Sequence, residues 1–425
     1  MAVIDLGELR ADDPPDPPAR PPRAAGRPFR SVVVLLAALV TLAGAAPAPR
    51  RVAATVPGGP GAAVFVVADR VYVVEPPDPE RGVGRQLVAY RATAGRPQTV
   101  WRVPLPGDGD AAMASGVDSW LLLACRAVTN NAGWETLALD AATGRLGWRR
   151  PGVAFRAGDA VLLHTSEGEG ADETRRLEVG TGRTLWSLPT PSNELSLSYG
   201  PSGIERLVLM HDSDTAEVFD ATSGVRLVAR DLGSGAPPGR RFVMTAVGLL
   251  LVIQDVSGTV TGYDLDTLDR RWSVSLPRVS YVDRCGRSLC AYRQDGGVGV
   301  LDPATGATRW TDRRWLAAPA AADGRLLVEQ PTATTSTLAV VEEATGRLVA
   351  DLGKWQVVPG ADRDDPVIGV RLGGDGRLII AELDPVAGHA RIRDALRGAV
   401  GDCSFGGALL VCRRIDGRFA LWWNR

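Results

Sequence analysis

The sequence predicts an all-β fold in which one unit of four short strands recurs along the chain, and two observations lead to this prediction. The first is a sequence motif, here called the phrase. It consists of a strand that ends in an acidic residue, a tight turn closed by glycine, and a returning strand with tryptophan. Its clearest copy carries Asp140, Gly144 and Trp148. The second is that the phrase returns at intervals of about 38 to 49 residues, a period typical of a propeller or a solenoid.

Seven further copies keep some or all of the acid, the glycine and the tryptophan. In chain order they contain Arg91, Gly95 and a displaced Trp101; Glu178, Gly182 and Trp186; Asp220 and Gly224; Asp264 and Trp272; Asp302, Gly306 and Trp310; Glu342 and Gly346; and Asp384 and Gly388. The copy that begins at Asp264 has Leu268 where the glycine belongs. Because the phrase recurs, it indicates a fold and says little about function.

Each position of the phrase has a physical reason. The carboxylate can accept hydrogen bonds from backbone N–H groups that the turn leaves open, and glycine adopts the positive φ that closes the turn. The indole lies on the outgoing strand, where a flat ring can wedge between one small sheet and the next. Such a sheet cannot bury both apolar faces alone, and stacking around a ring leaves only short edges. The sequence therefore predicts a β-propeller, most simply with eight four-stranded blades and alternatively with seven.

The predicted propeller covers residues 63–425. Each unit should begin with a short run of β-forming residues bounded by Gly, Asp or Ser, for example residues 120–124, 160–163, 206–210, 249–253 and 325–328. Residues 408–423 supply a partial last unit that stops where another strand should follow. We expect a strand within residues 52–65 to complete this unit and close the ring.

The phrase A-x-D-x-x-T-G-x-x-x-W resembles the repeat of pyrroloquinoline-quinone-type β-propellers, also called the tryptophan-docking motif, over about residues 60 to 425. That family includes quinoprotein alcohol dehydrogenases and the lipoprotein propeller of the outer-membrane β-barrel assembly machinery. The resemblance supports the propeller fold. It also implies either a quinone-dependent oxidoreductase or a protein-binding propeller without catalytic activity.

The residues before the propeller predict a membrane segment. Residues 1–30 are rich in proline and should form a disordered cytoplasmic tail. Residues 31–49 carry no charge, and as a helix they would span about 28 Å, close to a hydrocarbon core of roughly 30 Å. Four arginines between residues 20 and 30 place the N-terminus in the cytoplasm and the propeller outside the membrane. A cleaved signal peptide and an intracellular helix remain alternatives to this signal anchor, and residues 50–62 should be a linker.

Four of the five cysteines predict disulfides. Cys285 and Cys290 flank a two-strand turn, and so do Cys403 and Cys412. Cross-strand neighbours in a hairpin have Cβ atoms about 4.5–5.5 Å apart, near what a disulfide requires. We predict the bridges Cys285–Cys290 and Cys403–Cys412, which agree with an oxidising compartment, and keep buried thiols as the alternative. Cys125 is left over and is expected to be a buried, unreactive thiol.

No residue set predicts a metal site. The histidines stand in separate units without a second ligand at metal-binding spacing; they are His164, His211 and His389. Clustered aspartates could hold calcium, but such residues are common in turns for backbone reasons. The two clusters are Asp108 with Asp110, and Asp264 with Asp266 and Asp269.

Catalytic and cofactor motifs are also missing from the sequence. Quinone-binding relatives use adjacent cysteines, a stacking tryptophan and calcium with an aspartate base, whereas no two cysteines are adjacent here. Most of the eleven tryptophans are accounted for by the repeat position. Neither a Gly-x-Ser-x-Gly nucleophile motif nor a phosphate-binding loop is present. We therefore expect no catalytic, cofactor-binding or metal-binding residues.

What remains is a rigid frame that carries loops. The net charge of −1 argues against nucleic-acid binding, and a propeller usually binds partners on its loop faces or at its central channel. The longer insertions are the expected places, namely residues 75–85, 127–134 and 233–240. We expect a monomeric, membrane-anchored, non-catalytic scaffold for proteins of the cell envelope. A quinone- or sugar-binding oxidoreductase and a ligand-sensing ectodomain are the alternatives.

Overall fold

Strands make up almost all of the computed structural model. It describes residues 54–92, 96–107, 109–126, 133–165, 172–190, 195–233, 241–254, 257–332, 336–360 and 365–423. Within these ranges it has 36 strands and one 3-10 helix, η1 (Pro79–Arg81), and no helix there has the length and hydrophobicity needed to span a membrane. The predicted tail (residues 1–30) and membrane segment (residues 31–49) lie outside the described residues. The predicted all-β class is confirmed.

The strands follow one another in groups of four. The groups of the first half are β2 (Ala63–Val67), β3 (Arg70–Glu75), β4 (Gln86–Arg91) and β5 (Gln98–Pro104); β6 (Asp110–Val117), β7 (Trp120–Arg126), β8 (Trp134–Asp140) and β9 (Leu146–Pro151); β10 (Val153–Ala157), β11 (Ala160–Thr165), β12 (Glu173–Glu178) and β13 (Thr184–Pro189); and β14 (Leu195–Gly200), β15 (Gly203–Met210), β16 (Thr215–Asp220) and β17 (Arg226–Asp231).

The second half continues in the same way. Its groups are β18 (Arg241–Ala246), β19 (Leu249–Gln254), β20 (Thr259–Asp264) and β21 (Arg270–Ser275); β22 (Val279–Cys285), β23 (Ser288–Arg293), β24 (Val298–Leu301) and β25 (Thr308–Asp312); β26 (Ala317–Ala322), β27 (Arg325–Pro331), β28 (Ser336–Glu342) and β29 (Leu348–Lys354); β30 (Gln356–Val358), β31 (Ile368–Leu372), β32 (Arg377–Asp384) and β33 (His389–Arg397); and β34 (Ala399–Gly406), β35 (Leu409–Arg414) and β36 (Phe419–Trp423) with β1 (Ala54–Val56).

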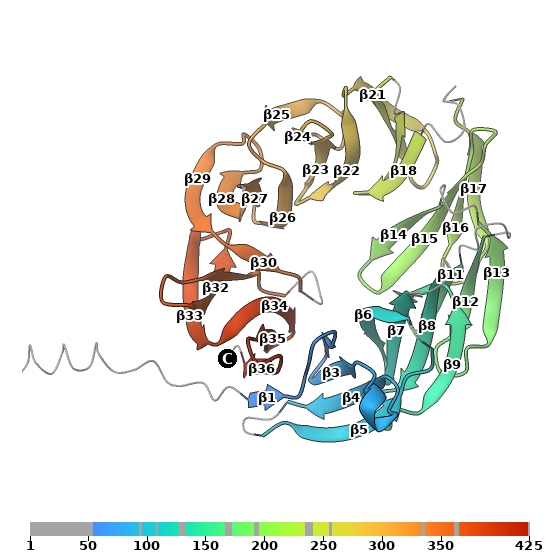
Figure 1. Cartoon of the computed structure of the whole chain (residues 1–425). Coiled ribbons are helices and arrows are strands. Elements are labelled where there is room, and N and C mark those ends of the chain that lie inside the picture. The colour runs from blue at the N-terminus through green and yellow to red at the C-terminus, as the bar shows by residue number, and fades with distance from the viewer. Residues whose placement is uncertain are drawn as a thin grey trace, which may run out of the picture. The chain divides into compact units, whose positions relative to one another are not determined.

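The groups of residues 51–425 follow one another around a ring, with the first strand of each group innermost and the fourth at the outer edge (Figure 1). The described strands form seven four-stranded sheets and one eight-stranded sheet. The larger sheet consists of β10–β13 and β14–β17, joined where Ala157 pairs with Gly203. The described strands thus make nine four-stranded groups, and the predicted count of eight is not confirmed. The prediction counted the closing group as part of one of the eight units that contain an acid turn. In the structure the closing group is a separate, ninth group.

The closing group combines both ends of the described chain. β1 pairs antiparallel with β36, so that Ala54 faces Leu421 and Val56 faces Phe419. The guanidinium of Arg413 donates to the carbonyl oxygens of Gly59 (3.2 Å) and Ala62 (2.6 Å), which ties the chain between β1 and β2 to the last group. The predicted closing strand is therefore present. It also corrects the predicted boundary, since the propeller begins at residue 54 and the expected linker of residues 50–62 contains a strand.

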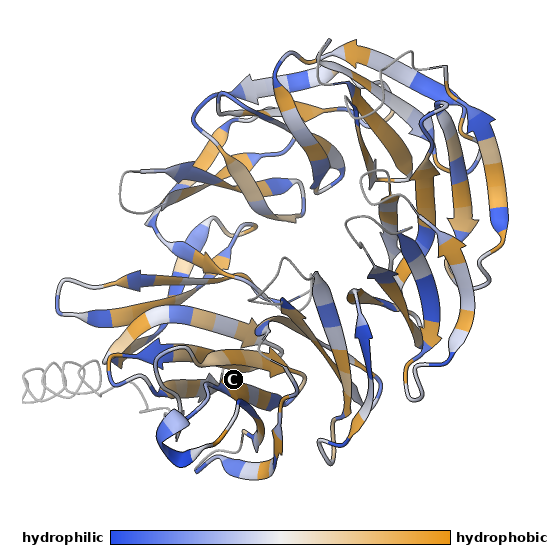
Figure 2. Ribbon diagram, turned by 45° about the vertical axis from the view of Figure 1, so that its right-hand side comes forward, coloured by the Kyte–Doolittle hydropathy of each residue, from blue (hydrophilic) through white to orange (hydrophobic). Residues whose placement is uncertain are grey.

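The hydrophobic core lies between neighbouring sheets. Val208 and Val218 of one group share a buried cluster with Leu250 and Val252 of the next. Because the second strand of each group is covered on both faces, it appears in the sequence as a continuous apolar run, as in β19. The outer strands have only one covered face, and β17 is mostly exposed. Figure 2 shows this difference as mainly apolar colouring of the middle strands and mixed colouring of the outer strands.

The acid turns have the geometry that the sequence predicts. Oδ1 of Asp140 accepts hydrogen bonds from the backbone N–H groups of Ala142 (3.1 Å) and Thr143 (2.8 Å) and from the Thr143 hydroxyl (2.7 Å). Gly144 has φ +74° and donates its N–H to the carbonyl oxygen of Asp140 (2.8 Å). These hydrogen bonds lower the pKa of Asp140, chiefly through the Thr143 hydroxyl. The turn is therefore stabilised by the ionised carboxylate.

The tryptophans join each group to the next. Each repeat indole donates its Nε1–H to a turn carbonyl oxygen of the following group; the pairs are Trp101 and Ala141 (2.9 Å), Trp148 and Val179 (2.7 Å), Trp186 and Thr222 (3.1 Å), Trp272 and Pro303 (2.8 Å), and Trp310 and Glu343 (2.9 Å). The ring lies directly on the turn glycine, since a Cβ on Gly144 would stand 2.6 Å from the ring of Trp101. The predicted wedge between sheets is confirmed, and Trp101 takes part despite its displacement in the sequence.

Leu268 replaces a turn glycine where the preceding group has no tryptophan. Val228 occupies the tryptophan position of that preceding group, because it pairs with Val218 beside a register shift as Trp148 does with Ala138. Leu268 adopts φ +57°, is fully buried, and shares a cluster with Val228. The leucine side chain thus lies where the small valine leaves room, so one departure from the repeat accounts for the other.

Both predicted disulfides are present. Cys285 and Cys290 join β22 to β23, and Cys403 and Cys412 join β34 to β35, with Cα atoms 5.7 Å and 4.0 Å apart. Each bridge therefore links the innermost strand of a group to its second strand. Cys125 is buried in β7 with a free thiol, and burial raises the pKa of that thiol.

Candidate interaction face

The two ends of each sheet differ in character. The end that carries the acid turns, here called the turn end, consists of short connections. At the opposite end, here called the loop end, the second strand connects to the third and the fourth strand connects to the next group. Because the tryptophans dock on the turns of the following group, consecutive turn ends lie side by side, and the loop ends therefore share the other side of the ring.

The three predicted insertions all connect strands at the loop end. Residues 75–85 join β3 to β4, residues 127–134 join β7 to β8, and residues 233–240 join β17 to β18. Of these, residues 127–132 and 234–240 lie outside the described residues. The first insertion contains η1, whose N-terminal Asp78 accepts a hydrogen bond from the Arg81 backbone at 3.3 Å. The strand ends that flank these three insertions thus lie on one side of the ring.

Arginines hold neighbouring loops together at this end. Arg85 lies 3.4 Å from Asp110 and also donates to the carbonyl oxygen of Gly109, which joins the first insertion to the next group. Arg241, whose side chain is buried, pairs with Asp214 and donates to the carbonyl oxygen of His211. The loop end is therefore a connected frame and not a set of independent loops.

Near Arg241, an ion-pair network fixes the loop between β15 and β16. Oε2 of Glu217 lies 2.9 Å from His211 Nε2, and its Oε1 lies 2.6 Å from Arg226. Burial alone would raise the pKa of Glu217, but the hydrogen bonds from His211 and Arg226 outweigh it and the pKa is lowered. Glu217 is therefore held as a carboxylate and is occupied by structural partners.

Exposed apolar side chains occupy one level of the inner strands. Through the strand pairing, Met113, Phe242 and Tyr281 each align with the residue four places before the acid of their group. Their exposed fractions are 44%, 53% and 43%. Phe242 and Tyr281 lie on the inner strands of consecutive groups. We call these three residues the inner apolar row.

Tyr281 is held rigidly. Its ring stacks on that of Tyr292, with centroids 4.4 Å apart and planes at 19°. Burial raises the pKa of Tyr292 to about 12, so the supporting ring is neutral at physiological pH. A rigid ring with one open side offers contact area at low entropic cost, as in many protein-binding sites. Sequence reasoning missed this row, although an aromatic residue 21 or 22 positions before the acid, in two consecutive units, could have indicated it.

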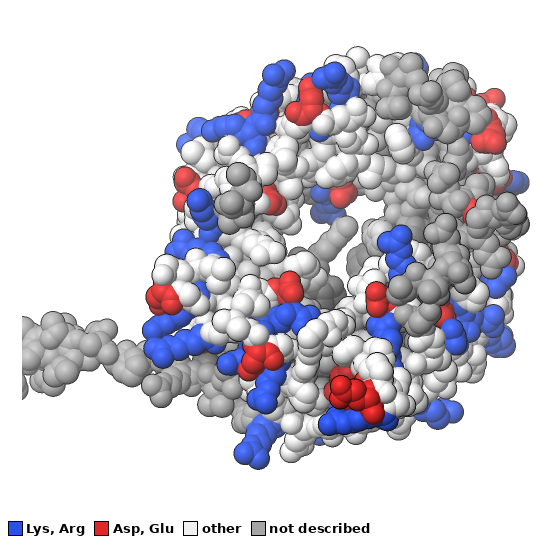
Figure 3. Space-filling view, viewed as in Figure 1, with Lys and Arg blue, Asp and Glu red and all other residues white. Residues whose placement is uncertain are grey.

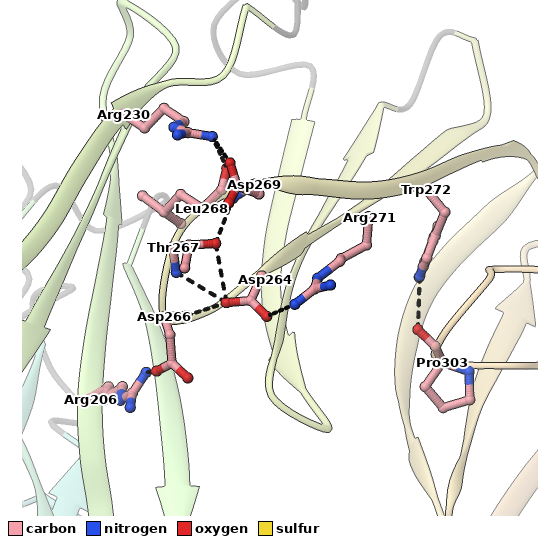
Figure 4. A network of polar contacts seen from close by, with 10 residues as sticks. All are labelled: Arg206, Arg230, Asp264, Asp266, Thr267, Leu268, Asp269, Arg271, Trp272 and Pro303. Carbon is pink, nitrogen blue, oxygen red and sulfur yellow. Dashed lines mark hydrogen bonds and ion pairs between the residues drawn. The ribbon is translucent and has the colours of Figure 1, made fainter.

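The aspartates weighed as a calcium site have other partners. Asp264, Asp266 and Asp269 point to three different arginines, namely Arg271 (2.6 Å), Arg206 and Arg230 (Figure 4). Oδ1 of Asp264 also accepts from the backbone of Asp266 (2.9 Å) and Thr267 (3.0 Å). The three carboxylates diverge, so they cannot enclose one cation in this arrangement. Asp110 pairs with Arg85, and Asp108 lies outside the described residues.

The histidines have separate local roles. His164 Nδ1 lies 3.1 Å from the Thr174 hydroxyl, and burial lowers the pKa of its imidazole. His211 pairs with Glu217, and His389 is exposed at the start of β33. Among the described residues no group of three or more His, Cys, Asp or Glu side chains has the geometry to hold a metal ion.

Comparison with models of known protein families identifies a family that this chain matches. A family model described as outer membrane protein assembly factor BamB matches residues 86–246 and 175–311, together more than half of the chain. No curated protein matches the chain.

Similar solved structures include the following three proteins. BamB from Moraxella catarrhalis has 15% identity and a TM-score of 0.42, with 85% of this chain and 93% of that chain covered. The computationally designed protein Ika8 has 16% identity and a TM-score of 0.49, with 75% and 98% covered. Dihydro-heme d1 dehydrogenase NirN has 12% identity and a TM-score of 0.43, with 69% and 66% covered.

Proposed function

Because the chain belongs to the family described as outer membrane protein assembly factor BamB, we propose that it is a protein-binding propeller that serves as a non-catalytic scaffold in the bacterial cell envelope. Its partner is a protein of the envelope, and the binding surface is the loop end together with the inner apolar row. The matched model supports the family, and the choice of surface comes from the geometry of this chain.

One observation carries the proposal, namely the inner apolar row. Phe242 and Tyr281 expose about half of their surface on rigid strands, and exposed aromatic residues of this kind are typical anchors of protein interfaces. The row lies beside the side of the ring on which the three insertions connect strands. A partner could therefore bury the aromatic anchors and contact the loops at the same time.

The proposed location is the outer side of the cytoplasmic membrane, with residues 31–49 as a single-pass anchor. The uncharged run and the arginines before it support this location. The bridges Cys285–Cys290 and Cys403–Cys412 also support it, since disulfides persist in oxidising compartments. Labelling with a membrane-impermeant reagent at an exposed cysteine introduced at Leu227 tests it, because labelling only after cell lysis would place the propeller in the cytoplasm.

The test of partner binding uses a photo-crosslinking amino acid at Phe242 or Tyr281 in the full-length protein in its native membrane. We expect both positions to give the same discrete adduct with an envelope protein. The matched control is Leu227, which is 53% exposed on the outer strand β17 and should not give that adduct. Equal crosslinking at all three positions would contradict a specific surface.

A separate measurement addresses catalysis. Quinone-dependent enzymes retain a chromophore, so the absorption spectrum of the purified full-length protein reports whether a quinone is bound. We expect no quinone absorption. A stoichiometric quinone in the purified protein would contradict the proposed non-catalytic scaffold and would favour an oxidoreductase.

A further inference from the structure

Two hairpin tips of neighbouring groups expose the least buried large apolar residues of the described chain. Leu372, the last residue of β31, is 65% exposed, and Ile415, between β35 and β36, is 77% exposed. The turn after Leu372 is closed by Gly373 N donating to Arg377 O (2.7 Å), and the turn around Ile415 by Arg414 N donating to Arg418 O (2.8 Å). Both tips are at the loop end. Ordered hairpins thus hold these side chains in solvent.

The two hairpins are connected to each other. Arg377 at the base of the first tip is the cross-strand partner of Arg397 on β33. The next residue, Gly398, accepts a hydrogen bond from the Ile415 backbone N–H at 2.9 Å. The strand register therefore links both tips through the pair of arginines. We call residues 371–377, 397–398 and 414–418 the double-hairpin surface.

The double-hairpin surface is basic. It contains five arginines and two aspartates, a net charge of +3; the arginines are Arg371, Arg377, Arg397, Arg414 and Arg418. The aspartates, Asp375 and Asp416, pair with Arg377 (3.0 Å) and Arg414 (3.5 Å). Figure 3 shows basic side chains, with acidic ones among them, over the region that β30 to β36 occupy in Figure 1. Arg377 and Arg397 lie directly opposite each other across β32 and β33, and Asp375 pairs with Arg377.

We propose that the double-hairpin surface binds an anionic lipid bilayer, with Leu372 and Ile415 entering the interface and the arginines contacting the headgroups. Apolar side chains ringed by arginine are the composition of interfacial membrane-binding segments. Arginine side chains can keep their charge at headgroup level while their stems lie in the apolar layer.

The experiment uses the full-length protein with an environment-sensitive fluorophore on Leu372→Cys or Ile415→Cys. The protein is combined with vesicles of phosphatidylcholine alone or of phosphatidylcholine with phosphatidylglycerol. We expect a severalfold rise in emission, and quenching by spin-labelled lipid, only with phosphatidylglycerol. High salt and the double variant Arg377→Gln with Arg397→Gln should each abolish the rise, because the attraction is electrostatic. Leu227→Cys, on an outer strand, is the matched control and should show no rise.

The outcomes separate this inference from the proposed anchor. Equal emission in both vesicle types, or an equal rise at Leu227→Cys, would overturn lipid binding by the tips. Emission that rises only when a membrane protein is added to the vesicles would overturn it in favour of a protein partner. Flotation with phosphatidylcholine vesicles reports the anchor independently. Protein that fails to float with them but shows the phosphatidylglycerol-dependent rise would contradict the anchor and support the tips.

Discussion

Leu268 and Val228 allow a direct test of how the groups are joined. In five other places an indole lies on the turn that follows it, and a side chain on the turn glycine would overlap the ring, since a Cβ would come within 2.5 to 2.8 Å. At Leu268 a side chain is present and the residue opposite it is Val228. We predict that the pair can be exchanged for tryptophan and glycine, but that neither residue can be exchanged alone.

The magnitudes follow from burial and backbone strain. Leu268→Gly removes a fully buried leucine side chain, which costs about 2–5 kcal/mol, and relieves a left-handed backbone conformation worth about 1 kcal/mol. The expected net loss of stability is about 1–4 kcal/mol. Val228→Trp places an indole where the leucine already lies, and overpacking of this kind costs about 1–3 kcal/mol.

The double variant Val228→Trp with Leu268→Gly should rebuild the contact seen at Trp148 and Gly182. We therefore expect it to be less destabilised than Leu268→Gly alone, which requires a favourable interaction energy between the two changes larger than the cost of Val228→Trp, about 1–3 kcal/mol. Urea unfolding of the four proteins, followed by circular dichroism, measures the cycle. A matched control pairs Val228→Trp with a distant substitution, Leu348→Ala on the outer strand β29 of another group, and should be additive. Additive losses in the Leu268 cycle would refute the complementarity of the two positions.

Three further outcomes are expected. Trp148→Phe should lose about 1 kcal/mol, the net worth of the hydrogen bond from Nε1 to Val179, whereas Trp148→Ala should lose about 3–5 kcal/mol in urea unfolding; equal losses would mean that the hydrogen bond contributes nothing. Replacing both cysteines of the Cys285–Cys290 bridge by alanine should lower the stability by about 2 kcal/mol, and reductant should lower the stability of the unmodified protein by about 2 kcal/mol more than that of this variant, which keeps only the Cys403–Cys412 bridge. In the folded protein the pKa of Asp302 is lowered, chiefly by Arg309, so as the pH falls the unfolded chain binds a proton at this residue before the folded protein does. The stabilisation by the Asp302 carboxylate is therefore present above the pKa of the unfolded chain and is lost as the pH falls through the pKa of the folded protein. Asp302→Asn should therefore flatten the loss of stability below about pH 4, and an unchanged pH profile would contradict a stabilising carboxylate.

Local features of the fold could be predicted from the sequence. The acid, the glycine and the tryptophan act within a hairpin or between consecutive units, so their spacing is enough to predict the turn and the docked ring. The pair Cys403 and Cys412 is similarly local, because the two residues lie on adjacent strands of one hairpin. The candidate insertions could also be found, since they interrupt a regular period.

The tertiary structure decided how these local units combine. The strand register alone shows that Phe242 and Tyr281 lie on one level and that Arg377 faces Arg397. Both depend on bulges and connection lengths that shift the pairing by single residues, and spacing in the sequence does not record such shifts. The number of groups likewise depends on which strand β1 pairs with. It pairs with β36, although the paired residues are more than 360 positions apart in the sequence. Short-range hydrogen bonds and turns are encoded in neighbouring residues, whereas register and closure are set by packing between distant ones.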